Sequence, residues 1–166
     1  MNCKNKNNYN ECNDWNKYRD YEDMLYQMFS EFYANSKLFY NGLEIKLKHY
    51  PPEYDERSCF YHLIYENYDE HKTEENRVPN PDRCKKLHWI KELICNCVVV
   101  PCEHILTWEN TRHGKRNVLI YCSDLKYLIV LSKRKGYYLL TTAYPVNTKH
   151  REDSLLNEYK QTTHSS

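Results

Sequence analysis

Histidine, basic and hydroxyl side chains in this sequence are the types needed for cleavage of an RNA phosphodiester without a metal. That chemistry requires a group to deprotonate the ribose 2′-hydroxyl, cations or hydroxyl donors for the charged phosphorane, and an acid for the leaving 5′-oxygen. The acid–base candidates are His62, His88 and His150. The cations and hydroxyl donors available are Arg83, Lys85, Arg116, Lys133, Arg134, Thr141, Thr142 and Tyr144.

A second cluster consists of four soft metal ligands within ten residues, Cys95, Cys97, Cys102 and His104. Structural zinc sites prefer paired Cys-x₂₋₄-Cys knuckles, whereas here the first pair is Cys-x-Cys and the second is Cys-x-His. The 8 Cys of the chain are expected to be reduced thiols, because no signal peptide is evident. The sequence therefore favours ordinary thiols with no metal and no cofactor, and zinc is the weaker alternative.

The charges of the chain are unevenly distributed. Its 24 Lys and Arg nearly balance 23 Asp and Glu, which gives a formal net charge of +1. Residues 1–75 hold 9 basic and 15 acidic side chains, a net of −6, whereas residues 111–166 hold 10 and 4, a net of +6. The C-terminal third can therefore meet a polyanion.

Composition excludes several classes of protein. No apolar run approaches the ~18–20 residues that span a bilayer, and the N-terminus lacks the apolar stretch of a signal peptide. We therefore expect a cytoplasmic protein with no membrane partner. The chain has only 3 Gly and neither a G-x-x-x-x-G-K-[ST] nor a G-x-G-x-x-G pattern, so NTPases and dinucleotide enzymes are disfavoured.

Hydrophobic periodicity predicts the elements that must position these side chains. Apolar residues at three- and four-residue intervals predict a helix over about 14–39, and Asn80-Pro81-Asp82 is a strong helix start. Alternating or continuous apolar runs predict strands over 43–47, 117–121, 127–131 and 137–144, followed by a helix over about 151–160. Helices before a run of antiparallel strands favour the α+β class.

Short motifs follow one another in a distinctive order. They are Phe60-x-His62-Leu63-x-x-Glu66, Pro81-Asp82-Arg83-x-x-x-Leu87-x-Trp89-Ile90, Trp108, the strand–turn–strand from Tyr127 to Thr142-Ala143-Tyr144, His150-Arg151 and Glu158-Tyr159. This order resembles the PBECR group, which comprises phage- and prophage-associated nucleases likened to barnase, EndoU, colicin nuclease domains and RelE. The resemblance covers about residues 39–160. Its most specific part is the buried strand, basic turn and Thr-Ala-Tyr strand.

The resemblance implies a small α+β fold in which helices pack on an antiparallel meander of about four to five strands. We accordingly expect a flexible lead and amphipathic helix over residues 1–38 and a ribonuclease-like domain over 39–166. The implied activity is metal-independent RNA cleavage that leaves a 2′,3′-cyclic phosphate. Two departures from the family pattern are His88, where proline is frequent, and Lys85-Lys86, which replace a more arginine-rich run.

Carried over residue by residue, the resemblance assigns catalytic roles to four side chains. His62 would be the acid or base, and Arg83 would clamp a phosphate through its planar fork. Thr142 would donate to a phosphate oxygen, and Tyr144 would stack on a base or donate a proton. Because side chains alternate along a strand, Thr142 and Tyr144 should share a face while Thr141 points the other way and serves as a control. The expected RNA-binding residues are Lys85, Arg116, Lys133, Arg134, His150 and Arg151.

Three functions remain open from the sequence. The first is a metal-independent endoribonuclease that acts as a phage- or prophage-associated toxin or defence effector. The second is a non-catalytic RNA- or protein-binding module with the same fold and basic face. The third is a zinc-stabilised interaction protein. The expected partners are RNA, with tRNA and mRNA as candidates, and a cognate antitoxin or other protein.

Overall fold

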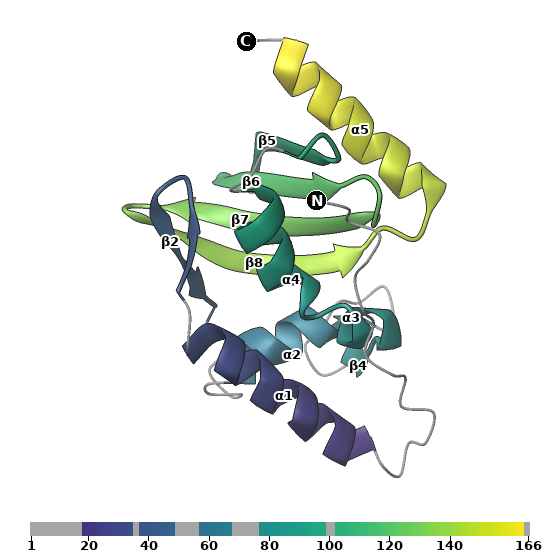
Figure 1. The fold of residues 1–166 in the computed structure, drawn as a ribbon. Coiled ribbons are helices and arrows are strands. Elements are labelled where there is room, and N and C mark those ends of the chain that lie inside the picture. Colours follow the sequence, from purple (N-terminus) through teal and green to yellow (C-terminus); the bar gives the residue numbers. More distant parts are fainter. Residues whose placement is uncertain (1–17, 35–36, 49–56, 68–76, 99–101, 165–166) are drawn as a thin grey trace.

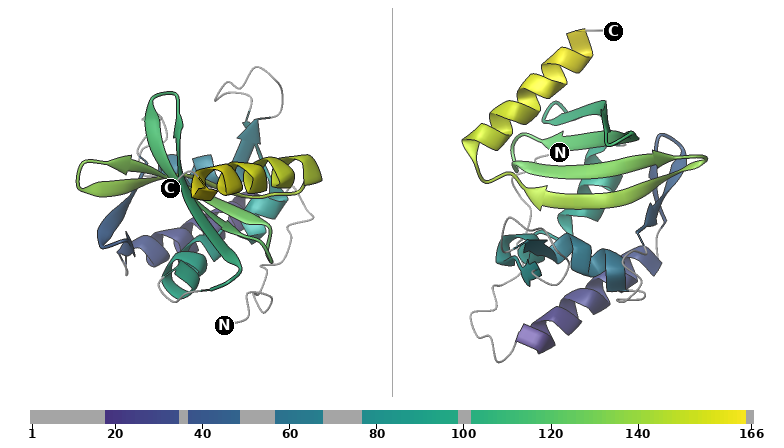
Figure 2. Two further views of the ribbon diagram at one scale, coloured as in Figure 1. Left: turned by 90° about the horizontal axis from the view of Figure 1, so that it is seen from above. Right: turned by 180° about the vertical axis from the view of Figure 1, so that it is seen from behind.

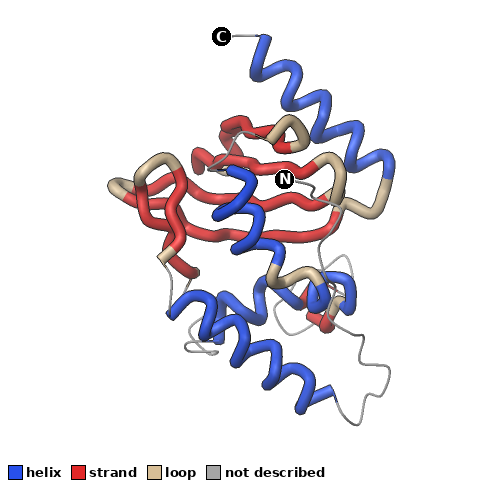
Figure 3. The backbone as a smooth tube through the Cα atoms, in the orientation of Figure 1, coloured by secondary structure: helices blue, strands red, loops and turns tan. Residues whose placement is uncertain are grey.

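The computed structural model describes residues 18–34, 37–48, 57–67, 77–98 and 102–164. The predicted flexible lead and the start of the first predicted helix lie outside these ranges. The helices of the described residues are α1 (Tyr18–Ala34), α2 (Ser58–Ile64), α3 (Pro81–Lys85), α4 (Trp89–Glu92), the π-helix η5 (Leu93–Val98) and α5 (Lys149–His164). Helices dominate the first part of the trace and strands the second (Figure 3).

A six-stranded sheet of order β1-β2-β8-β7-β6-β5 forms the centre of the molecule (Figure 1). Its strands are β1 (Leu38–Tyr40), β2 (Leu43–Leu47), β5 (Ile105–Arg112), β6 (Lys115–Cys122), β7 (Tyr127–Arg134) and β8 (Tyr137–Pro145). A separate two-stranded sheet pairs β3 (Tyr65–Asn67) with β4 (Arg77–Pro79). The α+β class is therefore confirmed, with a curled and mostly antiparallel sheet.

The sheet differs from the expected meander at both of its ends. Strand β5 was not predicted, and β2 joins the sheet by pairing parallel to β8, with Ile45 opposite Tyr138. A parallel pair needs a long connection. Here that connection contains α2, α3, α4 and the rest of the meander, so no local sequence pattern announces the pairing.

The first predicted helix ends earlier than expected. Asn41 and Gly42 have φ values of 46° and 76°, and positive φ at both central residues makes the tight turn that joins β1 to β2. The hairpin made by this turn uses Leu38–Tyr40 as strand β1, so the helix cannot continue to Phe39. Helix α1 ends at Ala34 instead. The missed signal was the Asn-Gly pair, which is typical of two-residue hairpins.

The helix start at Asn80 is confirmed in its details. The Asn80 side chain accepts a 3.0 Å hydrogen bond from the Arg83 backbone N–H, and Pro81 occupies the first helical turn. The expected single helix is divided, because α3 ends at Lys85 and α4 begins at Trp89. Its apolar side is still buried, and consists of Leu87, Ile90, Leu93 and Ile94.

The two faces of the sheet are covered differently. One face packs on α1, α2, α4 and η5 through a large core in which Leu25 and Phe29 of α1 join Ile120 and Ile129 of the sheet. Among the described residues, α5 is the helix that packs on the other face, through a smaller core that includes Leu155. The views from above and behind show α5 at one end of the strands, away from the β7–β8 turn, so the turn end of this face is covered by no helix of the described residues (Figure 2).

None of the described helices combines the length and the apolar character required to cross a bilayer.

Candidate functional site

A groove of about 360 Å³ lies on the α5 face of the sheet. It extends from the β5–β6 turn across β6 and β7 to β8, and reaches the end of β2 and the start of α5. Its basic lining residues are Lys48, Arg112, Lys115, Arg134 and Arg151, together with His113. No carboxylate lines this groove among the residues that the structure describes, so the charged side chains of its lining are all basic.

A β-bulge brings both threonines of β8 into the groove. Val130 pairs with Thr142 and Leu131 pairs with Leu140, so Thr141 is the extra residue on β8. Thr141 and Thr142 both line the groove, while Leu140 and Ala143 lie in the core. The expectation that Thr141 points away is therefore wrong, because strict alternation fails at a bulge. Thr141 is not a control for Thr142.

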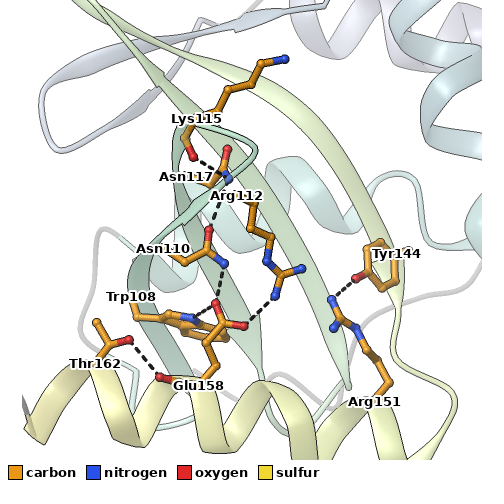
Figure 4. A network of polar contacts seen from close by, with 9 residues as sticks. All are labelled: Trp108, Asn110, Arg112, Lys115, Asn117, Tyr144, Arg151, Glu158 and Thr162. Atoms are coloured by element: carbon orange, nitrogen blue, oxygen red, sulfur yellow. Dashed lines mark hydrogen bonds and ion pairs between the residues drawn. The ribbon is translucent and has the colours of Figure 1, made fainter.

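Tyr144 connects the groove with the interior. Its hydroxyl accepts a 2.9 Å hydrogen bond from Arg151 of α5 (Figure 4). The guanidinium carbon of Arg83 lies 5.4 Å from the centroid of the Tyr144 ring. The structure thus brings together two of the predicted catalytic residues, Arg83 and Tyr144, with the predicted RNA-binding residue Arg151. Thr142 joins them as a neighbour in the groove lining.

His62 lies on α2 and contacts a second arginine. Arg77 donates to His62 Nδ1 at 2.8 Å, and the same guanidinium donates to the carbonyl oxygens of His62 and Tyr65. Arg83 also donates to the Tyr65 carbonyl oxygen, at 3.1 Å. The Tyr65 carbonyl therefore links the His62–Arg77 pair to the Arg83–Tyr144 pair.

The electrostatic setting of His62 keeps its imidazole neutral. Burial of the ring, followed by the positive charges of Lys48, Arg77 and Arg83, lowers the pKa of His62 to about 3. Arginine only donates hydrogen bonds, so Nδ1 must be the unprotonated nitrogen and Nε2 carries the proton. The Nδ1 lone pair is occupied, which leaves no free acceptor for a general base at that atom.

Glu158 of α5 lies outside the groove lining and accepts hydrogen bonds from three donors, two of which, Asn110 and Arg112, line the groove (Figure 4). Its carboxylate accepts hydrogen bonds from Trp108 Nε1 at 3.2 Å, from Asn110 Nδ2, and from Arg112 at 2.7 Å. Burial alone would raise the pKa of Glu158, but hydrogen bonds from Asn110 and Trp108 and the charge of Arg112 lower it overall. An ionised Glu158 therefore fixes the position of Arg112.

The predicted RNA-binding residues divide between the two sides of the sheet. Arg134 and Arg151 line the groove. Arg116 and Lys133 instead pair with Glu109, at 2.8 and 3.2 Å, and do not line it. The remaining two, Lys85 on α3 and His150 on the exposed first turn of α5, are also outside the lining.

The predicted acid–base candidate His88 and the possible zinc ligands lie outside the groove lining. His88 is 4% exposed, with Nε2 3.9 Å from Glu92. Among the possible zinc ligands, Cys95 is exposed on η5, Cys102 is half-buried, and His104 contacts Asp124 at 3.2 Å. The side chain of Cys97 is outside the described residues. Within those residues, no group of three or more His, Cys, Asp or Glu is arranged to hold a metal ion.

Several groove residues were missed in the sequence. Arg112, His113 and Lys115 come from the β5–β6 turn, where His113 and Gly114 have φ values of 50° and 70°. A His-Gly pair between basic residues is a recognisable hairpin signal. The positions of Lys48 and Arg77 had no such signal, because they depend on how distant elements pack.

Comparisons with known proteins were made on three levels. Searches against protein-family models, curated proteins and solved structures found no match for this chain.

Proposed function

We propose that this protein binds RNA in the basic groove beside α5. The observation that carries the proposal is a groove lining with five Lys or Arg side chains and no carboxylate among the described residues. Cations that neutralise phosphates release counterions, which supplies most of the sequence-independent affinity for nucleic acid. The threonine hydroxyls and the Tyr144 ring add the hydrogen-bonding and stacking groups that RNA-binding surfaces use.

The first test neutralises two groove cations. Lys115 and Arg134 have no ion pair within the described part of the chain, so their removal breaks no such pair. We expect Lys115→Gln/Arg134→Gln to weaken binding of a labelled oligouridylate. It should also reduce the slope of log K against log salt concentration by about 1.4, or about 0.7 per lost phosphate contact. Fluorescence anisotropy across a salt series measures both quantities.

The matched control changes the neighbouring cations. Arg116→Gln/Lys133→Gln alters the same two strands and the same net charge, but these side chains pair with Glu109 instead of lining the groove. We expect a salt slope close to that of the wild-type protein. Equal loss of affinity in both double variants would contradict a binding site in the groove.

RNA cleavage without a metal is a second candidate function, favoured by the arrangement around Tyr144. Arg151 can only donate, so the Tyr144 oxygen accepts from it and the phenol proton remains available for a phosphate oxygen. The 2′-oxygen would attack phosphorus and the bond to the 5′-oxygen would break, giving a 2′,3′-cyclic phosphate and a 5′-hydroxyl. Arg151 and Tyr144 would stabilise the phosphorane. The imidazole of His113, which lines the same groove, would take the proton of the 2′-hydroxyl and deliver it to the leaving 5′-oxygen, so that the transfer has no net proton change.

This second candidate agrees with the resemblance to PBECR-group nucleases. In this chain, the Thr-Ala-Tyr strand and the basic turn before it, which carry the resemblance, belong to one mostly antiparallel sheet. A role as a toxin, as a defence effector or as the target of an antitoxin stays a prediction from that resemblance. His62 is neutral and its Nδ1 accepts a hydrogen bond from Arg77, so the proposed reaction does not use His62 for proton transfer.

The second test removes one oxygen from the groove. Tyr144→Phe keeps the ring beside Arg83 but loses the hydroxyl, so cleavage of RNA in excess chelator should fall by about 10²-fold or more. Binding to RNA should change only a few-fold. Tyr159→Phe, on α5 and outside the groove, is the control. Cleavage by the Tyr144→Phe variant at the wild-type rate would remove Tyr144 from the reaction.

A further inference from the structure

A row of polar side chains crosses the floor of the groove from one strand to the next. Thr141 of β8 contacts Ser132 of β7 at 3.0 Å, and Ser132 contacts Asn117 of β6 at 2.7 Å. Asn117 contacts Asn110 of β5 at 3.3 Å, and Asn110 contacts Glu158 of α5. Figure 4 shows the last three members of this row. The row thus forms one continuous hydrogen-bond chain.

The direction of every hydrogen bond in the row is determined by Glu158. A carboxylate only accepts, so Asn110 must present Nδ2 to Glu158 and therefore Oδ1 to Asn117. Asn117 must then present Nδ2 to Asn110, which leaves its Oδ1 to accept from Ser132. The only proton of Ser132 is used in that bond.

The Lys115 carbonyl imposes the same direction independently, and the Leu139 carbonyl is a second acceptor for the Thr141 proton. Asn117 Nδ2 also donates to the Lys115 carbonyl oxygen at 3.3 Å, which again places its Oδ1 toward Ser132. At the other end, the two partners of the Thr141 hydroxyl are Ser132 Oγ and the Leu139 carbonyl oxygen. Each of them accepts, so the single Thr141 proton is used inside the protein.

We infer that Thr141 Oγ1 is an acceptor-only group in the groove and reads the ribose 2′-hydroxyl of bound RNA. Thr141 lines the groove, and because its proton is donated within the protein, its two lone pairs can only accept from a ligand. The 2′-hydroxyl is the sugar group that distinguishes RNA from DNA, and it can donate to such an acceptor. The inference rests on the proposed RNA binding and adds a specificity-determining residue to it.

The experiment compares three oligouridylates of one length, built from RNA, 2′-O-methyl RNA and DNA. The 2′-O-methyl form keeps the ribose oxygen but has no 2′ donor. Affinities are measured in excess chelator, and the RNA is recovered afterwards to confirm that it is intact. We expect the wild-type protein to prefer RNA to both other probes by about 2- to 10-fold, the equivalent of one neutral hydrogen bond.

Variants of Thr141 attribute that preference to one atom. Thr141→Val should lose the preference for RNA over DNA and 2′-O-methyl RNA, and Thr141→Ser should restore it. Thr111→Val is the matched control, since Thr111 is exposed on β5 outside the groove.

The outcomes separate this inference from the proposed function. Equal binding of all three probes, with loss in Lys115→Gln/Arg134→Gln, would leave RNA binding in place and overturn the role of Thr141. Binding of 2′-O-methyl RNA as tightly as RNA, or an RNA preference that persists in Thr141→Val, would overturn it as well. Failure of the wild-type protein to bind any probe would reject the proposed function itself.

Discussion

His62 has an environment suited to a structural side chain. Its Nδ1 accepts from Arg77, and that guanidinium also satisfies the carbonyl oxygens of His62 and Tyr65. A protonated imidazole would face the positive charges of Lys48, Arg77 and Arg83 and would lose its hydrogen bond to Arg77. The neutral ring therefore holds α2 against β4.

Acid should destabilise the fold through His62. The folded side chain gains a proton only near pH 3, whereas the unfolded side chain does so near its ordinary value of 6.5. Between these values the unfolded state binds more protons, so the free energy of unfolding falls as the pH falls, by up to about 1.4 kcal/mol per pH unit. In His62→Asn, which keeps an acceptor for Arg77, this contribution to the slope should be absent.

Urea denaturation between pH 6.5 and 5 measures the effect. Carboxylates such as Glu158, whose pKa is lowered from its ordinary 4.5, lose their stabilising contribution mainly at more acidic pH, and the other histidines are common to both proteins. The difference between the wild-type protein and His62→Asn in this window therefore reports on His62. The same pH dependence in the wild-type protein and His62→Asn would show that the ring is not held neutral by its surroundings.

At the scale of elements, α5 both covers the sheet and supplies part of the groove. Leu155 is fully buried against the sheet, and the rings of Tyr159 and Trp108 meet at 5.7 Å. Arg151, from the N-terminal part of the same helix, lines the groove and donates to Tyr144. The way α5 docks therefore controls the geometry of the groove.

Glu158 should be the most sensitive polar residue of α5. Its replacement in Glu158→Ala leaves Trp108 Nε1 and Asn110 Nδ2 without their acceptor and Arg112 without its counter-charge. We expect a loss of about 1–3 kcal/mol in the free energy of unfolding, as for other hydrogen bonds to charged groups. Thermal and urea denaturation measure it.

The control for this prediction is Asp153→Ala, an exposed acidic residue on the same helix. Its removal should change the free energy of unfolding by less than about 0.5 kcal/mol. If the two variants proved equally stable, Glu158 would have no special part in docking α5.

At the scale of the whole molecule, the opposite charges of the two ends serve different surfaces. On α1, Asp23 pairs with Arg57 at 2.9 Å and Glu22 accepts from Tyr65 at 2.8 Å, so these acids connect α1 to the α2 region. The basic C-terminal third supplies Arg112, Lys115, Arg134 and Arg151 to the groove. A net charge of +1 thus conceals a locally cationic surface.

Local patterns in the sequence predicted the parts of the fold that depend on local physics. The Asn80 cap, the continuous apolar run of β7 and the amphipathic α5 each follow from neighbouring residues, and each is confirmed. The bulge at Thr141 and the parallel pairing of β2 depend on distant strands, and neither was foreseen.

The candidate site was predictable to a similar extent. The Thr-Ala-Tyr strand identified the groove wall, but the partners of its side chains come from elements far apart in sequence. Tertiary packing alone places Lys48 and Arg77, and one sequence read alone does not specify such packing. Strand register also determines on which face of the sheet a cation lies. Arg134 lines the groove, whereas Arg116 pairs with Glu109 outside it.

The parallel pairing of β2 with β8 also affects when the chain can fold. Ile45 must find Tyr138, about 90 residues later in the sequence, and such a distant contact makes the loop to be closed long and folding slow. During synthesis, β1 and β2 would leave the ribosome well before their partner strand exists. Their apolar residues would stay uncovered until β8 has emerged, which is the interval in which a nascent chain is most exposed to aggregation and most dependent on chaperones.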